Sequence, residues 1–269
     1  MKNQLSAYSS NFIYFPLPYH YAGYQYSKVT QNGTLTLMST VGVPYGLYAR
    51  LALVAITRLA CMTDKASIED ISLYEMLNDL REAKPRGAQL DKFEKQLESW
   101  ATTVINFMYE DDTWRTYRNL LLIKEGRFAL QKNLKENEKV QITFSDDGLE
   151  FFRSNLIPIP TEAVREIEQS FDFDVLNWLV LTIYQCREKN SILTPWQSLY
   201  TQFQISPKNY PKFRTNFTGT LLEMKKRFYP KAKIHKSREG GLIIENSPLL
   251  TDERTLLMPS FRQDKENPS

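Results

Sequence analysis

The stretch from residue 196 to 246 constrains the fold more than any other part of this chain, because the spacing of its apolar residues changes from helical to alternating. Two runs have helical spacing, and their apolar positions are Trp196, Leu199, Tyr200 and Phe203, then Phe213, Phe217, Leu221, Met224 and Phe228. Pro195 is expected in the first turn of the first helix, and Pro230 ends the second. Two short strands around Gly240-Gly241 follow. The pattern predicts helix, turn, helix and hairpin, which is a winged helix-turn-helix.

Positive charge is concentrated on the same stretch. Ten basic and two acidic residues lie between Pro195 and Gly240, for a net charge of +8, while the rest of the chain carries −5. A single Lys-Lys-Arg run is usually a solvated helix face. Because here the charge gathers on the second helix and the hairpin of a winged motif, we expect it to neutralise DNA phosphates.

The position of each residue along the second helix separates two kinds of candidate DNA contact. Arg214, Thr215 and Thr218 are the base-edge candidates, since arginine can bind guanine through two hydrogen bonds, and Gly219 permits close approach. The phosphate candidates are Lys208, Lys212, Lys225 and Lys226. Asn209 and Lys236 complete this DNA-binding set, and Arg238 at the hairpin tip is expected against a minor groove or a phosphate. Arg227 and Lys233 are expected to be solvated.

The region before residue 155 has a similar order of elements. Helices are expected at 45–62, 72–81 and 88–102, and strands at 104–108, 117–123, 128–131 and 140–144. The order is again that of a winged helix, with a longer wing. The predicted fold class is therefore α+β, with two winged helix-turn-helix domains in tandem. Possible DNA contacts in this region are Lys84, Arg86, Lys92 and Lys95. Because acidic residues are interleaved with them, we expect weaker contacts, or a dimer surface.

Two prolines mark the expected boundary between the domains. Residues 1–155 are predicted to form the N-terminal winged-helix domain, including an extended arm at its start. Ile157-Pro158-Ile159-Pro160 predicts a stiff connector. Residues 161–250 are predicted to form the C-terminal DNA-binding domain, with a main helix at 170–187. The charged residues 251–269 are expected to be a flexible tail.

Several motifs occur in a characteristic order over about residues 12 to 250. They are Pro44-Tyr45-Gly46-x-x-x-Arg50-Leu51, Asp174-x-x-x-Trp178-Leu179, Trp196-x-x-Leu199-x-x-Gln202-Phe203, Phe213-x-x-x-Phe217-x-x-x-Leu221 and Tyr229-Pro230-x-Ala232. In this order the chain resembles the Rep-type plasmid replication initiators of Gram-negative bacteria. It departs from that family in having Gly87 where a glycine pair is usual, and Gln204 where a glycine usually follows Gln-Phe.

The resemblance implies a specific activity. Such a protein binds direct repeats, called iterons, in the double-stranded DNA of a plasmid origin and helps to melt an adjacent A·T-rich segment. It recruits the host initiator and the replicative helicase. Monomers bind the repeats, whereas dimers joined through the N-terminal domain repress the initiator's own gene. A winged-helix transcriptional regulator without a replication role is the alternative that shares this architecture.

Catalytic chemistry has little support in the sequence. The two histidines, His20 and His235, are 215 positions apart, so the paired histidines of a nickase are missing, and there is no Gly-x-x-x-x-Gly-Lys-Ser/Thr loop for ATP. Glu110-Asp111-Asp112 and Asp172-x-Asp174 leave open a Mg²⁺-dependent, primase-like enzyme. The simpler interpretation is a strand-end turn and the N-terminal turn of a helix, respectively. We expect no enzymatic activity, no cofactor and no metal site.

Cysteine usage and hydropathy indicate a cytoplasmic protein. Cys61 and Cys186 both lie in apolar helical runs, so buried free thiols are expected. No secretory signal is recognisable at the start. The longest apolar stretch, residues 47–62, contains Arg50 and Arg58 and is too short to cross a bilayer. No membrane partner is expected.

Overall fold

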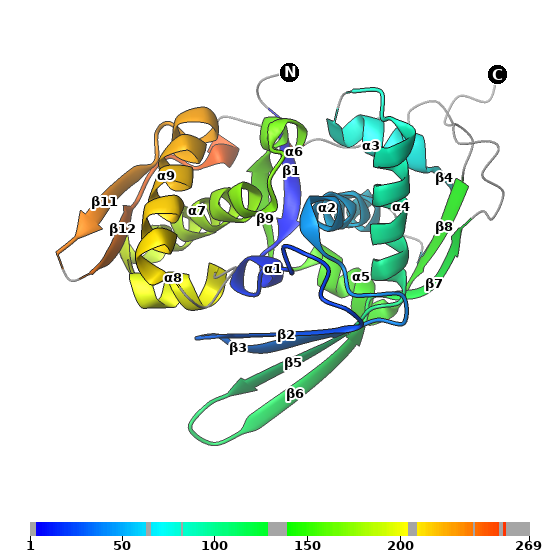
Figure 1. Cartoon of the computed structure of the whole chain (residues 1–269), viewed down its shortest axis with the longest axis horizontal. Helices are drawn as coiled ribbons and strands as arrows, with labels where there is room; N and C mark the ends of the chain where they lie inside the picture. The colour runs from blue at the N-terminus through cyan, green and yellow to red at the C-terminus, as the bar shows by residue number, and fades with distance from the viewer. Residues whose placement is uncertain are drawn as a thin grey trace.

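The computed structural model describes residues 4–62, 66–81, 83–128, 139–203, 209–238, 240–252 and 255–256. Two units, each combining helices with a three-stranded sheet, lie at opposite ends of the molecule, and a four-stranded sheet projects from it (Figure 1). A pair of strands, β1 and β9, lies between the units.

The first unit is built around a buried helix. Its elements in order are α2 (Gly46–Met62), β4 (Ser67–Ser72), α3 (Leu73–Arg81), α4 (Gly87–Ala101), β7 (Ile123–Phe128) and β8 (Lys139–Phe144). The sheet has the order β4-β8-β7. Helix α2 is buried on all sides along most of its length, as an apolar run requires. The three predicted helices are present within one or two residues of their expected ends.

The second unit repeats this order of elements. They are α7 (Ser170–Lys189), β10 (Ser191–Pro195), α8 (Trp196–Phe203), α9 (Tyr210–Phe228), β11 (Lys233–Ser237) and β12 (Gly241–Glu245). The sheet order is β10-β12-β11, so the strand that comes last in the chain lies between the other two, as β8 does in the first unit. The helix, helix and hairpin expected from the sequence are present. Strand β10 was not expected, and Pro195 ends this edge strand opposite Gly241 instead of starting the helix.

The four-stranded sheet corrects the expectation of a long wing. It consists of β2 (Gln25–Thr30), β3 (Gly33–Met38), β5 (Val104–Glu110) and β6 (Arg115–Leu121), all antiparallel. The hairpin of β5 and β6 therefore leaves the first unit to join β2 and β3 (Figure 1). The strand expected at 128–131 lies at 123–128, and residues 129–138 are outside the described residues.

The connector between the units is a paired, buried strand. Strand β9 (Leu156–Pro160) pairs antiparallel with β1 (Gln4–Ser9), which pairs parallel with β13 (Thr255–Leu256). The connector is extended, as its prolines require, but it is paired with β1, which lies between it and β13 in the sheet. The expected tail is corrected in part, because residues 250–252 form a short helix and 255–256 a strand; residues 257–269 lie outside the described part. The remaining elements are α1 (Asn11–Tyr14), α5 (Asp146–Arg153) and α6 (Thr161–Glu166).

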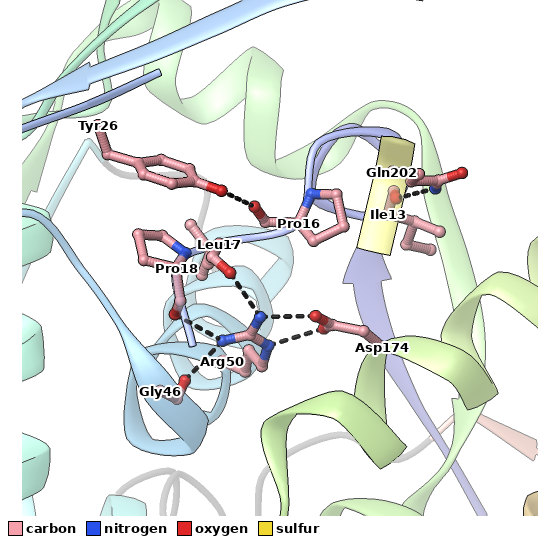
Figure 2. A network of polar contacts seen from close by, with 9 residues as sticks. All are labelled: Ile13, Pro16, Leu17, Pro18, Tyr26, Gly46, Arg50, Asp174 and Gln202. Carbon is pink, nitrogen blue, oxygen red and sulfur yellow. Dashed lines mark hydrogen bonds and ion pairs between the residues drawn. The ribbon is translucent and has the colours of Figure 1, made fainter. Parts of the chain in front are cut away.

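A buried ion pair joins the two units (Figure 2). Arg50 of α2 is 0% exposed and Asp174 of α7 is 2% exposed. Their side chains meet through two hydrogen bonds, Nε to Oδ1 at 2.7 Å and Nη2 to Oδ2 at 2.6 Å. The guanidinium also donates to the carbonyl oxygens of Gly46 and Leu17, at 2.8 and 2.9 Å. Burial alone would lower the pKa of Arg50, but Asp174 more than offsets this and the pKa is raised. Of the two aspartates expected in the N-terminal turn of α7, Asp172 lies there, whereas Asp174 lies beyond the first turn and is bound by Arg50.

Lys28 of β2 is a buried cation near this pair, and its pKa leads to a stability prediction. Burial lowers the pKa of Lys28 from 10.5 to about 8, although Asp174 raises it in part. Between these two values the unfolded chain binds one proton more than the folded chain, so the free energy of unfolding rises with pH. Lys28→Met should therefore stabilise the fold by about 1–3 kcal/mol near neutral pH and remove that rise. Urea denaturation below and above the pKa tests this; an unchanged pH dependence would contradict it.

The sequence predicted two buried free cysteines and no membrane-spanning segment. Both cysteines are free, but only Cys186 is buried; Cys61, expected to be buried, is exposed at the end of α2. None of the helices in the described ranges combines the length and hydropathy needed to span a membrane.

Candidate nucleic-acid interface

Helix α9 starts at a side-chain cap. Asn209 is its N-cap, and its Oδ1 accepts a hydrogen bond from the backbone N–H of Lys212 at 3.1 Å. Pro211 lies in the first turn, where a missing N–H costs nothing. Asn209, predicted as a DNA contact, thus has a structural role as well. Lys208, predicted to bind a phosphate, lies outside the described residues.

One face of α9 is fixed by an aromatic cluster. Phe217, Leu221, Met224 and Phe228 are buried, as their spacing predicted. The ring of Phe217 is within 6.2 Å of five other rings, those of Phe171, Trp178, Trp196, Phe203 and Phe213. Because these rings come from α7, α8 and α9, they set the rotation of α9 and therefore decide which residues face outward.

The opposite face of α9 carries positive charge and no carboxylate. Its residues along the helix are Lys212, Arg214, Thr215, Thr218, Gly219, Leu222, Lys225 and Lys226. Thr218 and Lys225 are half-buried and the others are exposed. Glu223 lies to one side of this face, paired with Arg227 at 3.3 Å, and Arg227 also pairs with Glu166 at 3.2 Å. Arg227 is therefore engaged within the protein, whereas it was expected to be solvated.

A groove between α9 and the hairpin β11–β12 brings four predicted DNA contacts together. Arg214, Thr215, Thr218 and Lys236 all line it, with Trp196 at its wall. The guanidinium carbon of Arg214 lies 5.2 Å from the centre of the Trp196 ring. This cation–π contact holds the head of an exposed arginine in place without using its N–H donors. Those donors remain available for a bidentate contact to guanine.

The two threonines present acceptors and methyl groups rather than donors. Thr218 Oγ1 donates to the carbonyl oxygen of Arg214 at 2.8 Å, and Thr215 Oγ1 donates to that of Pro211 at 3.3 Å. A hydroxyl has one proton, so what each side chain still offers is a lone pair and a methyl group. These suit the amino groups of adenine and cytosine, or the methyl group of thymine.

Gly219 has no structural reason to be a glycine. A Cβ added there would meet nothing within 4 Å, and glycine inside a helix costs stability relative to alanine. Close approach of another molecule is a physical reason for it.

A second groove, on the other side of α9, is lined by Lys212 and also by the predicted contacts Asn209, Thr215 and Gly219, so Thr215 borders both grooves. Lys212 lines it together with Asp172, at the N-terminal end of α7. Asp172 Oδ1 accepts a hydrogen bond from Thr220 at 3.3 Å. Burial raises the pKa of Asp172. Lys212 therefore does not share the groove of Arg214, and a phosphate bound on this side would lie near a carboxylate.

The predicted contacts of the hairpin and of the helix end lie at the rim. Arg238 is exposed at the hairpin turn, where Gly240 has a φ of +90° and Glu239 is outside the described residues. Lys226 is exposed near the end of α9, one turn beyond Leu222. Residues at these places reach outward from the groove, which suits phosphates more than base edges.

The candidates in the first unit surround helix α4, which has the place in that unit that α9 has in the second. Lys84 and Arg86 are exposed just before α4, and Lys92 and Lys95 are exposed on it. The Lys92 ammonium lies 6.0 Å from the centre of the Tyr48 ring. The structure does not bring these four residues to the groove of α9.

The acidic cluster at 110–112 forms a turn, as expected. Asp111 Oδ1 accepts hydrogen bonds from the backbone N–H groups of Thr113 and Trp114, at 2.8 and 2.7 Å, and Glu110 pairs with Arg115. Within the described ranges, no three His, Cys, Asp or Glu side chains lie close enough together to hold a metal ion.

Sequence reasoning assigned no role to two residues of this interface. Trp196 was assigned to the core, but its ring also holds Arg214. Leu222 lies among the polar candidates on the outward face of α9. A large apolar residue among polar ones on that face was the available signal, and Leu222 is 53% exposed.

Comparisons with known proteins identify a shared fold. No protein-family model matches the chain, and neither does any curated protein. The crystal structure of selenomethionine derivatives of domains 2 and 3 of RctB superposes with a TM-score of 0.57 at 10% sequence identity, covering 88% of this chain and 97% of that chain. A second crystal structure of RctB domains 2–3 gives a TM-score of 0.53 at 8% identity, covering 89% and 96%. The chain therefore has a mixed α/β fold similar to that of RctB domains 2 and 3.

Proposed function

We propose that this chain is a replication initiator that binds double-stranded DNA through two winged-helix units in tandem, within 1–155 and 161–250. Three observations support the proposal. Both units have the order helix, strand, helix, helix, strand, strand, with the same strand order in their sheets. RctB, whose domains 2 and 3 share the fold, is a replication initiator. The motifs that resemble Rep initiators run through both units.

The groove lined by Arg214, Thr215, Thr218 and Lys236 carries the proposal. In this mechanism α9 enters the major groove, which admits one helix. Arg214 reads guanine from its position on Trp196, and Thr215 and Thr218 contact neighbouring base edges. The lysines at the rim bind phosphates and supply affinity that depends on salt. The hairpin β11–β12 is the wing and follows the DNA backbone, with Arg238 at its tip.

The finer steps rest on the resemblance to plasmid Rep proteins. We propose that the sites are iterons in a plasmid origin, that the protein acts in the cytoplasm, and that it recruits the host initiator and the replicative helicase. A monomer would bind the repeats and a dimer, joined through the N-terminal domain, would repress. We propose no catalytic activity, because Asp174 is bound by Arg50 and Asp111 by its own turn.

A footprint on the DNA that flanks the chain's own gene tests the proposal. The purified protein should protect evenly spaced direct repeats, and protection should persist at near-physiological salt. Diffuse protection that salt removes would contradict sequence-specific binding. A plasmid that carries only this gene and its flanking DNA then distinguishes an initiator from a transcriptional regulator, because only an initiator maintains the plasmid in transformed cells.

Arg214→Ala and Lys226→Ala form a matched pair that separates base reading from phosphate binding. Arg214→Ala should weaken binding to the matched site by about 1–3 kcal/mol and relax the preference at one base pair. Lys226→Ala should weaken binding to matched and mismatched sites alike, and reduce the slope of log K against log salt by about one. Titrations of both duplexes at several salt concentrations measure this. Equal losses on both sites for Arg214→Ala would contradict its role.

A further inference from the structure

We propose that Leu222 determines part of the DNA specificity by contacting the 5-methyl group of a thymine in the major groove. This inference rests on the proposed function, because it requires α9 to lie in that groove. A methyl group accepts and donates no hydrogen bond, so the charged side chains of α9 do not select it.

The surroundings of Leu222 are those of an interface rather than of a core. On a helix, the neighbours of a residue are those three and four positions away. For Leu222 they are Thr218, Gly219, Lys225 and Lys226, all four of which are proposed DNA contacts. Leu222 thus lies in the middle of the charged face, and it is not among the residues that pack against the hydrophobic core. Its side chain is 53% exposed.

The glycine beside it leaves this leucine prominent. Gly219 lies one turn before Leu222, and a Cβ built on Gly219 would meet nothing within 4 Å. No side chain covers the helix backbone next to the leucine, so a base edge can come close to the helix at this point. An isolated exposed leucine needs no explanation. This leucine lies beside a glycine at the centre of a basic helix face, and that arrangement needs one.

The chemistry of the major groove gives such a leucine one complement. The base edges there present hydrogen-bond donors and acceptors, except for the 5-methyl group of thymine. A leucine placed against a polar edge removes water from that edge without offering a hydrogen bond, which is unfavourable. Against a methyl group it buries apolar surface on both sides. Leu222 should therefore favour thymine and disfavour the other bases at one position.

Replacement of thymine by uracil tests this contact, because the change removes only the methyl group. The probe is a duplex site selected by the wild-type protein from a random-sequence pool, with each thymine changed to uracil in turn. At one or two positions the wild-type affinity should fall about fourfold, the effect of burying one methyl-sized group. Leu222→Ala should bind the thymine and uracil duplexes equally at those positions. Lys225→Ala, the matched control, should bind all duplexes more weakly and keep the fourfold difference.

The outcomes separate this inference from the proposed function. If the random pool yields no preferred site, sequence-specific binding itself is wrong, and the inference with it. If a site is found but Leu222→Ala keeps every uracil effect, or no thymine is sensitive, the protein reads DNA and Leu222 does not. A further pair of duplexes carries cytosine or 5-methylcytosine at one position. If Leu222 raises affinity only for 5-methylcytosine over cytosine, and not for thymine over uracil, the thymine assignment is overturned. An unchanged thermal melting curve by circular dichroism shows that Leu222→Ala is folded.

Discussion

Arg50→Ala is expected to lower the free energy of unfolding by about 3–5 kcal/mol, because it leaves a buried carboxylate without its partner. Asp174 is 2% exposed and receives two hydrogen bonds from Arg50. The substitution also removes the side-chain donor of the buried carbonyl oxygen of Leu17, and a buried acceptor left without a donor adds to the loss. Urea denaturation followed by circular dichroism measures the change.

A double variant shows how much of this loss comes from the isolated charge. Arg50→Met combined with Asp174→Leu removes both charges of the pair and should be much less destabilising than Arg50→Ala, because neither member of the pair is left buried without the other. Arg115→Ala is the control, since it breaks an ion pair whose partners, Arg115 and Glu110, are both exposed to solvent, and it should change stability little. Equal losses for Arg50→Ala and Arg115→Ala would contradict the prediction.

Phe217→Ala is the second substitution with a large expected effect. The side chain is fully buried, and its ring contacts five others. Removing a buried phenylalanine ring costs about 3–5 kcal/mol through lost burial and the cavity left behind. DNA affinity should fall as well, because Trp196, which holds Arg214, packs on the same ring. Denaturation and DNA titration of one sample measure both effects.

The position of Phe217 on α9 provides its own control. Leu222 lies on the opposite face of the same helix and is 53% exposed. Leu222→Ala should leave the free energy of unfolding unchanged within about 0.5 kcal/mol. If Phe217→Ala and Leu222→Ala change the free energy of unfolding equally, the aromatic cluster does not orient α9.

Local sequence patterns predicted the second unit well. The aromatic residues of α9 recur every three or four positions, so the buried and exposed faces follow from spacing alone. Pro211 and Pro230 bound the helix, and the Gly240-Gly241 pair marks the hairpin. For the same reason, the sequence placed Arg214, Thr215 and Thr218 on one exposed face. It missed β10, because a five-residue strand that ends in proline has no distinctive period.

Contacts between distant segments could not be predicted in this way. Arg50 and Asp174 are 124 residues apart, and each reads locally as an ordinary charged residue on a helix. The pairing of β1 with β9 and β13 likewise joins residues 4–9 to residues 156–160 and 255–256. The hairpin of β5 and β6 was assigned to a wing, because its order in the chain does not reveal that β3 is its partner.

What the sequence determined by itself is the set of elements, the faces of the helices and the place where charge gathers. Each of these depends on residues within a few turns of one another, so periodicity, caps and turn residues are sufficient to define it. Only the tertiary structure decided that Trp196 holds Arg214, that Lys236 shares their groove, and that Arg50 joins the units through Asp174. These relations depend on packing between segments far apart in the chain, where shape and burial, rather than local spacing, select the partners.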